Sequence, residues 1–328
     1  MTAGTNVLVT SASRKVGLVR AFQEALAKEG GGRVIAVDAS PLSPALYAAD
    51  EYEVVPRGDS AAAVQGLLSI CERRKVRLLV PTRDEELPLL AAHRERFESI
   101  GVLPLVSPPQ AVRLCQDKRA FVAFCEARGF AVPRTWTEGA RPEPGEYPVF
   151  FKPRHGKGGQ GAGPVASPDH LALLLAQDPG GMVQEFVRDQ EYTIDLCADL
   201  QGRAISAVPR QRLRIVAGES YVSRTVRHPA LIAEAVRLAQ ELGLVGHVTI
   251  QCFFEGARAP RFIEVNPRFG GAANLGFAAG APTPQYIVRM AKGEPVAPRL
   301  GEFQDGLVML RYATDTFMAA ASLPGSAS

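Results

Sequence analysis

Residues Arg261–Gly276 read RFIEVNPRFGGAANLG, and this stretch decides the fold that we predict. It begins with apolar and polar residues in alternation, which is typical of a half-buried strand. Successive side chains of a strand point to opposite faces, so Glu264 and Asn266 share one face while Ile263 and Val265 take the other. The strand therefore carries two oxygen donors on one face.

The residues that follow indicate a ligand at the end of this strand. Pro267 has no N–H to donate to a ladder and ends the strand. Arg268 places a cation beside the oxygen donors, and Gly270-Gly271 lets backbone come close to a bound group. The alternative is a strand that ends in a charged, solvated turn.

A second strand, His247–Phe254, precedes this one and reads HVTIQCFF. If Phe254 pairs with Arg261 in an antiparallel hairpin, the same register sets Gln251 directly opposite Glu264. Three side-chain oxygens would then meet on one face, a set that hard cations such as Mg²⁺ prefer. The predicted metal ligands are Gln251, Glu264 and Asn266.

The bulk properties are those of an ordinary globular protein. The chain has 328 residues, 46% of them hydrophobic and 22% charged, and a formal net charge of +3. No block of Lys and Arg is present, so we expect no nucleic-acid partner. The five cysteines are scattered and read as free thiols in a reducing compartment. We find no signal peptide or long apolar span, and we expect a cytoplasmic protein without a membrane segment.

The N-terminal part predicts a β-α-β unit of Rossmann type. Strands Asn6–Thr10 and Arg33–Asp38 flank a helix at Leu18–Lys28. Its loop lacks the pattern G-x-G-x-x-G, because Ser11 and Ser13 stand where the first two glycines would be. The sequence therefore indicates dinucleotide binding only weakly.

Further α/β steps follow, with a helix at Ala61–Lys75 and a strand at Arg77–Pro81. Ligands of open parallel sheets bind beyond the carboxyl ends of the strands. Some polar residues at those ends are candidates for substrate contacts, and they are equally explained as helix caps. They are Asp38, Thr82, Arg83 and Asp84.

A glycine-rich loop is the second strong signal. After an amphipathic helix at Ala111–Arg128, the strand Tyr147–Pro153 ends in Lys152 and opens into His155–Gly163, HGKGGQGAG. Such a loop can close over a polyphosphate with its backbone N–H groups. It is not a Walker A loop, since no Gly-Lys is followed by Ser or Thr. A flexible hairpin without a ligand is the alternative.

Two further strands carry polar faces. In Gln190–Ala198, Glu191 and Asp195 lie on one face of a half-buried strand. In Pro209–Val216, Arg210, Arg212 and Arg214 share a face. Such a stripe either neutralises phosphates or lies solvated at a sheet edge.

Together these stretches resemble the ATP-grasp superfamily, and within it single-copy relatives of the carbamoyl phosphate synthase large subunit. The resemblance covers roughly residues 5–290, through the motifs LVTSASRKVGLVRAF, DKRAF, VFFKP, GKGGQGAG, VQEFV with EYTIDL, and IQCFF with FIEVNPRFGG. It implies an α/β and α+β fold in four parts. These are a Rossmann-like pre-ATP-grasp domain at 1–110, a first ATP-grasp subdomain at 111–187, a second at 188–312, and a tail at 313–328.

The resemblance also implies roles for individual residues. Lys118 and Lys152 would contact nucleotide phosphates beneath a loop that includes Gly158, Gly159 and Gly161. Glu185 and Val187 match the hinge that binds adenine, and Glu191 matches the residue that holds the ribose. Gln251, Glu264 and Asn266 match the Mg²⁺ positions, Arg268 the residue that binds phosphate or acyl phosphate, and Arg210 the arginine that faces the reacting carboxylate; Arg214 is less securely placed.

The function that this resemblance implies is ATP-dependent ligation. A carboxylate is activated as an acyl phosphate, ADP leaves, and an amine or similar nucleophile captures the acyl group. ATP and Mg²⁺, with Mn²⁺ as a substitute, are the expected cofactors, and small molecules or a second copy of the chain are the expected partners. The chain departs from carbamoyl phosphate synthase in having one ATP-grasp copy. Two alternatives stay open: a nicotinamide-dependent oxidoreductase, and an ATP-binding regulatory module without turnover.

Overall fold

A computed structural model describes residues 4–56, 60–136, 139–156, 159–256, 258–319 and 323. The first unit is a parallel sheet of five strands in the order β3-β2-β1-β4-β5. Its strands are β1 (Asn6–Thr10), β2 (Val34–Asp38), β3 (Glu51–Val54), β4 (Val76–Pro81) and β5 (Leu103–Pro104). Its helices are α1 (Val16–Lys28), α2 (Pro44–Ala48), α3 (Ala61–Arg73), η1 (Asp84–Glu86), α4 (Leu87–Ala92) and α5 (Arg94–Glu98). The predicted β-α-β unit is confirmed.

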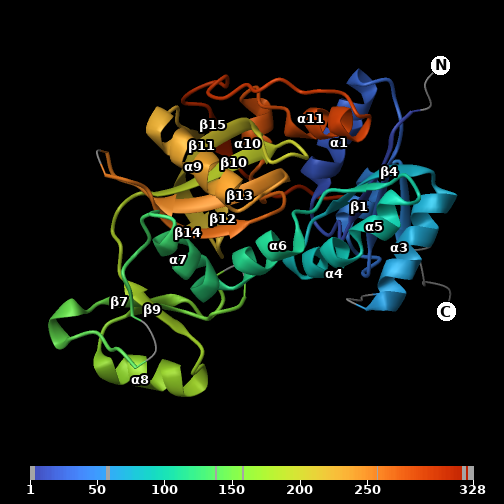
Figure 1. The fold of residues 1–328 in the computed structure, drawn as a ribbon. Helices are drawn as coiled ribbons and strands as arrows, with labels where there is room; N and C mark the ends of the chain where they lie inside the picture. Colours follow the sequence, from blue (N-terminus) through green and yellow to red (C-terminus); the bar gives the residue numbers. More distant parts are fainter. Residues whose placement is uncertain are drawn as a thin grey trace.

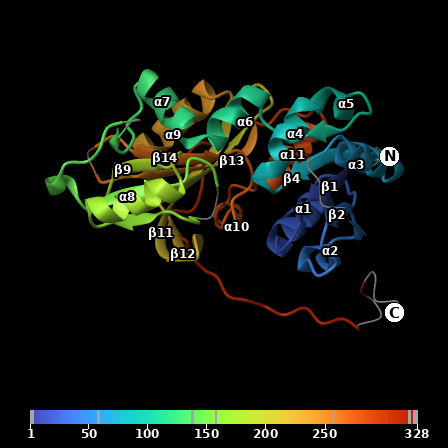
Figure 2. The ribbon, with the colours of Figure 1, turned by 90° about the horizontal axis from the view of Figure 1, so that it is seen from below.

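The second unit is an antiparallel sheet of six strands in the order β14-β13-β10-β11-β12-β15. The strands are β10 (Glu191–Ala198), β11 (Ala204–Val216), β12 (Glu219–Thr225), β13 (Gly246–Phe253), β14 (Arg261–Asn266) and β15 (Val308–Leu310). Helices α9 (Pro229–Glu241), α10 (Asn274–Ala278) and α11 (Thr283–Ala291) belong to the same part of the chain. Ile194 and Ile250 pack with Leu231 and Leu238 of α9 in one apolar core. Figure 2 shows the chain beyond β15 running away from the sheets as an extended trace.

The third unit is a small antiparallel sheet in the order β6-β9-β7-β8. It contains β6 (Thr135–Trp136), η2 (Pro144–Glu146), β7 (Val149–Lys152), β8 (Gly163–Val165), α8 (Pro168–Gln177) and β9 (Met182–Glu185). Figure 1 shows this sheet and α8 on the opposite side of the molecule from the parallel sheet, with α6 (Pro109–Gln116) and α7 (Lys118–Ala127) between them. The glycine-rich segment is the loop between β7 and β8, as predicted.

A shared apolar core joins the parallel sheet to the six-stranded sheet. Val7 and Phe22 of the N-terminal unit pack in one cluster with Cys197 of β10 and Phe269, which follows β14. The rings of Phe22 and Phe269 meet edge to face, with 5.8 Å between their centroids. Burial of this apolar surface holds the two sheets together and so sets the position of the loops between them.

A β-bulge corrects the predicted hairpin between β13 and β14. Gln251 does lie opposite Glu264, as predicted, but Arg261 pairs with Phe253 and not with Phe254. The register shifts by one residue next to Gln251, because Ile263 is an extra residue in β14. As a consequence Phe262 and Val265 are the buried core residues of β14, at 1% and 2% exposure, and the prediction that Ile263 shares the face of Val265 is wrong.

Two other predictions need correction. The helix predicted at Ala111–Arg128 is two helices, because Asp117 has extended dihedral angles and caps α7. The polar face predicted for a half-buried β10 is itself buried, with Thr193 and Asp195 each 2% exposed. Neighbouring strands on both sides cover that face with polar partners.

Candidate active site

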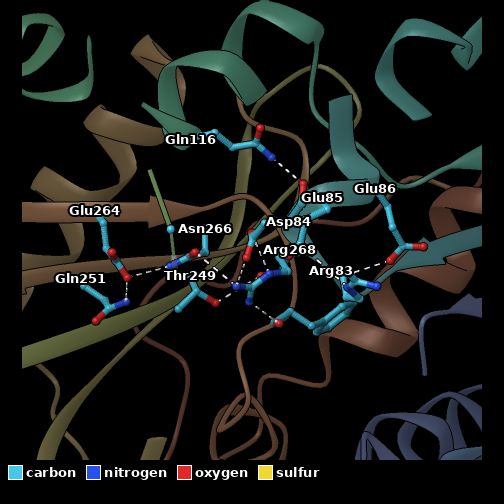
Figure 3. A network of polar contacts seen from close by, with 12 residues as sticks. Arg83, Asp84, Glu85, Glu86, Gln116, Thr249, Gln251, Glu264, Asn266 and Arg268 are labelled. Atoms are coloured by element: carbon cyan, nitrogen blue, oxygen red, sulfur yellow. Dashed lines mark hydrogen bonds and ion pairs between the residues drawn. The ribbon is translucent and has the colours of Figure 1, made fainter. Parts of the chain in front are cut away.

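The carboxylate of Glu264 is the centre of the site, and Figure 3 shows the side chains around it. Its Oε1 atom accepts hydrogen bonds from Gln251 Nε2 and from Asn266 Nδ2, the latter at 3.1 Å. Asn266 Oδ1 in turn accepts from Arg268 Nη2 at 3.3 Å. The three predicted metal ligands therefore lie together, and Arg268 lies beside them.

Arg268 is held from the other sheet. Its Nε and Nη2 donate to the two carboxylate oxygens of Asp84 at 2.8 and 2.5 Å, and both side chains are mostly buried. The Thr249 hydroxyl donates to the Arg268 carbonyl at 3.2 Å. Of the polar residues at the ends of the parallel strands, Asp84 is thus the one that reaches the site. Asp38 instead accepts from the backbone N–H groups of Ser13 and Ser40 at 2.8 and 2.9 Å, so it holds two loops and caps neither α1 nor α2.

Lys152 is a buried cation that faces Glu264. The residue is 5% exposed, and within the described part of the chain its Nζ has no hydrogen-bond partner. Burial lowers the pKa of Lys152 to about 8, while Glu264 pulls it upward and Lys118 pushes it further down. An unpartnered buried ammonium is costly unless a ligand supplies an acceptor. Phosphate oxygens are acceptors of that kind.

Lys118 lies close by at the start of α7. Its Nζ donates to the Gly156 carbonyl at 2.9 Å, and burial lowers its pKa although Glu264, Asp84 and Asp117 all act to raise it. The two lysines predicted to contact phosphates are therefore brought to the same carboxylate. Their distance along the chain gave no sign of this proximity.

Asp117 is a residue that the sequence interpretation missed as part of the site. It caps α7 by accepting from the N–H groups of Arg119 and Ala120 at 3.0 and 3.2 Å. It also binds the guanidinium of Arg154 through both oxygens, at 2.9 and 2.6 Å. The hydrogen bond from Arg154 is the main cause that lowers the pKa of Asp117 to about 2. This carboxylate therefore ties the start of the Lys118 helix to the end of the Lys152 strand.

The residues predicted to form the phosphate-covering loop and the adenine hinge lie in the small antiparallel sheet and its loops. Gly159 and Gly161 have φ of +71° and +70°, which other residues rarely adopt, and Ala162 N–H donates to the Gly159 carbonyl at 3.1 Å. Gly158 lies outside the described residues. At the hinge, Glu185 Oε1 accepts from Arg261 Nη1 and from the Arg134 N–H, both at 2.9 Å. Val187 lies in the segment that leads from β9 to β10.

The arginines of β11 divide in a way that the sequence did not indicate. Arg210 is 3% exposed and donates to Asp195 Oδ2 at 2.7 Å and to Ser220 Oγ at 3.0 Å. Arg212 contacts Glu191 and Gln251, which are the predicted ribose and metal residues. Because β11 lies between β10 and β12, the solvated-edge alternative fails for both. The sequence feature that indicated Arg212 was the series of arginines at alternate positions of β11.

The β1–α1 loop brings further charges to the Arg268 end. Burial and the nearby Arg268 lower the pKa of Lys15 to about 8. Glu219 lies beside this loop, 3.6 Å from Arg14 and 2.7 Å from Arg311. A small molecule at this end would meet cations from both sheets.

The donor set fits a divalent cation of the Mg²⁺ type. One carboxylate and two amide side chains supply oxygen, and no cluster of three or more His, Cys, Asp and Glu residues occurs in the described residues. Such a set leaves several coordination positions for phosphate oxygens and water. The unpartnered Lys152 ammonium is the second observation that favours a phosphate-bearing ligand.

Comparison with protein families agrees with this geometry. Residues 7–105 match the family described as PylC-like, N-terminal domain, and residues 177–314 match the family described as ATP-grasp in the biosynthetic pathway with Ter operon. The second match contains Gln251, Glu264, Asn266 and Arg268.

The chain has the ATP-grasp fold, and residues 177–314 match an ATP-grasp family.

The chain matches curated relatives at low sequence identity over most of its own length. It is 24% identical over 295 residues to the carbamoyl phosphate synthase large chain of Gemmatimonas aurantiaca, a match that covers 82% of this chain and 26% of the relative. The same protein of Thermus thermophilus is 24% identical over 296 residues, with coverage of 81% and 28%. The ATP-grasp chain thus spans about a quarter of the length of these relatives.

Solved structures share its fold. The biotin carboxylase domain dimer of Hydrogenobacter thermophilus 2-oxoglutarate carboxylase, in complex with MgADP, ADP and bicarbonate, superposes with a TM-score of 0.71 at 16% identity and covers 94% of this chain and 74% of its own. The L-amino acid ligase of Bacillus licheniformis gives 0.69 at 17% identity, with coverage of 93% and 78%. In the described residues of this ATP-grasp chain no helix has the length and apolar character needed to cross a membrane.

Proposed function

We propose that this ATP-grasp chain is an ADP-forming ligase that activates a carboxylate as an acyl phosphate and couples it to an amine or similar nucleophile. The observation that carries the proposal is the convergence on Glu264. The Glu264 carboxylate accepts hydrogen bonds from the amides of Gln251 and Asn266, and Asn266 also contacts Arg268. The buried Lys152 ammonium, from another sheet, is close enough for Glu264 to raise its pKa. We keep the residue roles and the four-part domain division of the sequence analysis as part of this proposal.

The relatives support the reaction class. Among the similar structures are an L-amino acid ligase and an ADP complex of N5-carboxyaminoimidazole ribonucleotide synthetase, the latter with a TM-score of 0.68 at 16% identity. The match to carbamoyl phosphate synthase large chains covers only 26–28% of them, so their complete reaction is not carried over. A homodimer is the partner that we propose besides small molecules, and light scattering tests it.

The first step is phosphoryl transfer. A carboxylate oxygen of the substrate attacks the γ-phosphorus of ATP, the new O–P bond forms, and the bond to the β-phosphate oxygen breaks with ADP leaving. Phosphoryl transfer depends on positioning and on neutralising the phosphoryl oxygens. Mg²⁺ bound at Gln251, Glu264 and Asn266 would supply charge there. Lys152 and Lys118 hold the phosphates, and Arg268 stabilises the acyl phosphate.

The second step forms the product. The nucleophile attacks the acyl carbon, the C–N bond forms, and the C–O bond to phosphate breaks with its electron pair leaving on phosphate; the amine proton passes to water. Arg268, which Asp84 holds in place, would stabilise the charge that develops on the departing phosphate. Closure of the glycine loop around Gly159 and Gly161 would exclude water from the acyl phosphate.

The oxidoreductase alternative is weakened by the β1–α1 loop. Ser11 and Ser13 occupy left-handed positions, with φ of +47° and +46°, where the dinucleotide fingerprint has glycine. Asp38, which in such a fingerprint binds ribose, accepts hydrogen bonds from this loop and from Ser40. The carboxylate oxygens of Asp38 therefore bind backbone N–H groups of the protein itself.

The experiment that tests the proposal is an incubation with ATP, Mg²⁺, hydroxylamine and a panel of carboxylic acids that includes the amino acids. Hydroxamate together with ADP and phosphate supports the acyl-phosphate reaction. AMP and pyrophosphate would contradict it, because they require attack at the α-phosphorus. Binding of ATP without hydroxamate or ADP release on any acid favours the regulatory module, and a thermal shift with NADH but not with ATP favours the oxidoreductase.

A further inference from the structure

Arg212 makes four contacts that link both ends of the nucleotide site. Its Nη1 donates to Glu191 Oε1 and, at 3.1 Å, to Gln251 Oε1. Its Nε donates to Ser220 Oγ at 3.0 Å, and its Nη2 to the Gly218 carbonyl at 2.7 Å. The side chain is 9% exposed. One guanidinium thus binds both the proposed ribose residue and a proposed metal ligand.

The neighbouring arginines of β11 cannot take this role. Arg210 is fixed by Asp195, whose carboxylate is buried beside it. Arg214 is exposed, as are Leu213, Ile215 and Val216 in the same end of β11. Arg212 is therefore the member of the stripe that contacts both Glu191 and Gln251.

The contact with Gln251 has a chemical consequence. A glutamine binds a metal ion through its carbonyl oxygen, and Gln251 Oε1 is the atom that accepts from Arg212. A divalent cation on this oxygen would lie within a few ångström of the guanidinium, and two cations at that distance repel strongly inside a protein. An anion between them would remove the repulsion. The terminal phosphate of a nucleotide is such an anion, and guanidinium binds phosphate through paired hydrogen bonds.

We propose that Arg212 and the divalent cation are alternative partners of Gln251 Oε1, and that Arg212 turns to the terminal phosphate when the metal–nucleotide complex binds. The inference rests on the proposed function, since it needs a nucleotide and a metal at this site. It assigns Arg212 as a phosphate-binding residue that also sets how strongly nucleotide binding depends on the metal. Its Nε contact with Ser220 Oγ lies further back on the side chain and can persist while Nη1 moves.

The test measures the coupling between metal and nucleotide without turnover. The dissociation constant of the non-hydrolysable analogue AMP-PNP is determined by calorimetry in EDTA and in saturating Mn²⁺, for the whole chain. The ratio of the two constants is the coupling factor, and by linkage it equals the effect of the nucleotide on Mn²⁺ affinity. Electron paramagnetic resonance of Mn²⁺ measures that second quantity independently.

In Arg212→Met we expect weaker AMP-PNP binding in saturating Mn²⁺, by about 10-fold, because a charge-assisted phosphate contact is lost. We expect tighter Mn²⁺ binding to the chain without nucleotide, because a competing cation is removed, so the coupling factor falls at least about 10-fold. Arg214→Met is the matched control from the same strand and leaves the factor unchanged. Arg212→Lys keeps the charge and is expected to keep the factor within about 3-fold of the wild type.

Two outcomes overturn the inference. An unchanged coupling factor in Arg212→Met shows that Arg212 and the metal do not compete. A coupling factor that falls in Arg212→Lys as far as it does in Arg212→Met shows that the charge of Arg212 is not the cause. Wild-type chain that binds no AMP-PNP with or without Mn²⁺ would instead refute the proposed function itself, and with it the inference.

Discussion

Arg268 and Asp84 form a two-pronged ion pair across 184 residues of sequence, with Nε–Oδ1 and Nη2–Oδ2 distances of 2.8 and 2.5 Å. Asp84 comes from the helical turn that follows β4 of the parallel sheet, and Arg268 follows β14 of the antiparallel sheet. Figure 3 shows that the pair stands at the end of the row formed by Gln251, Glu264 and Asn266. The N-terminal unit therefore helps to position a residue of the proposed reaction.

Asp84→Asn tests this relationship. The amide keeps the size of the side chain and loses the charge that orients Arg268, so we expect the rate of ADP release to fall about 10-fold or more. ATP affinity should stay within about 3-fold, because the Asp84 carboxylate bonds to Arg268 and to neither lysine of the phosphate end. The free energy of unfolding should drop by about 1–3 kcal/mol, the usual cost of losing a charge-assisted hydrogen bond. Urea unfolding and steady-state kinetics measure the two effects.

The control for that variant is Glu95→Gln, which removes an exposed carboxylate of α5. A double-mutant cycle with Arg268→Gln isolates the pair. If the effects of Asp84→Asn and Arg268→Gln on the rate are simply additive, Asp84 does not act through Arg268.

Glu264→Gln removes the carboxylate of the proposed metal set. The strand pattern and the hydrogen bonds from Gln251 and Asn266 survive, so the melting temperature should change little. Turnover should fall by ~10²–10³ or more, since a fixed charge at the transferring phosphoryl group is typically worth that factor. Glu255→Gln, in the exposed turn that precedes β14, is the matched control. Near-normal ADP release by Glu264→Gln in Mg²⁺ would refute the metal assignment.

Lys152→Met should separate stability from function. The pKa of Lys152 is lowered from 10.5 to about 8, so the unfolded chain binds a proton more readily than the folded chain. Burial of this ammonium is then a cost to stability that is fully present below pH 8 and is relieved as the pH rises toward 10.5. We therefore expect Lys152→Met to raise the melting temperature at about pH 7 while weakening ATP binding about 10-fold or more.

The pH dependence of the stability of Lys152→Met is a second test. The stability gain of Lys152→Met over the wild type should shrink between pH 8 and pH 10.5, as the wild-type cost disappears. Lys28→Met, an exposed lysine in the last turn of α1, should show neither the gain nor the loss of ATP binding. A fall in melting temperature together with unchanged ATP affinity would assign Lys152 a purely structural role.

Arg210→Met concerns the buried pair with Asp195. Burial by itself raises the pKa of Asp195, but Arg210 and His247 outweigh it and hold the pKa at about 2, below the usual 3.8. The folded-state pKa is depressed, so this carboxylate contributes stability above about pH 4 that is lost as the pH falls through 2. Removal of Arg210 leaves a buried unpaired charge, and we expect a loss of about 3–5 kcal/mol at about pH 7.

Acid unfolding followed by circular dichroism checks this expectation. Its midpoint should move to higher pH in Arg210→Met and stay in place in Arg214→Met, whose side chain is exposed. We also propose that Arg210 faces the reacting carboxylate, and this role predicts a fall in the rate of ADP release at a temperature where the variant is folded. A folded Arg210→Met with a wild-type rate would remove Arg210 from the site.

The clustering of the three proposed metal ligands could be predicted because it depends on local chemistry. Alternation along β14 put Glu264 and Asn266 on one face, and the short turn before it limited the register that sets Gln251 opposite Glu264. A run of glycines after Lys152 likewise indicated a loop that binds phosphate. The bulge at Ile263 was not predicted, because one more apolar residue in an apolar stretch does not change the sequence pattern visibly. The bulge nevertheless places Phe262 in the core.

The partners of the charged residues were decided only by the tertiary structure. Three arginines at alternate positions of β11 look equivalent in sequence, yet Asp195 holds Arg210, Glu191 and Gln251 hold Arg212, and Arg214 lies in the exposed end of the strand. Asp84 was indistinguishable from a helix cap until the apolar core shared by the two sheets brought it to Arg268. Backbone periodicity is a local property that the sequence determines, whereas the contact of two charges far apart in the chain depends on how whole layers pack.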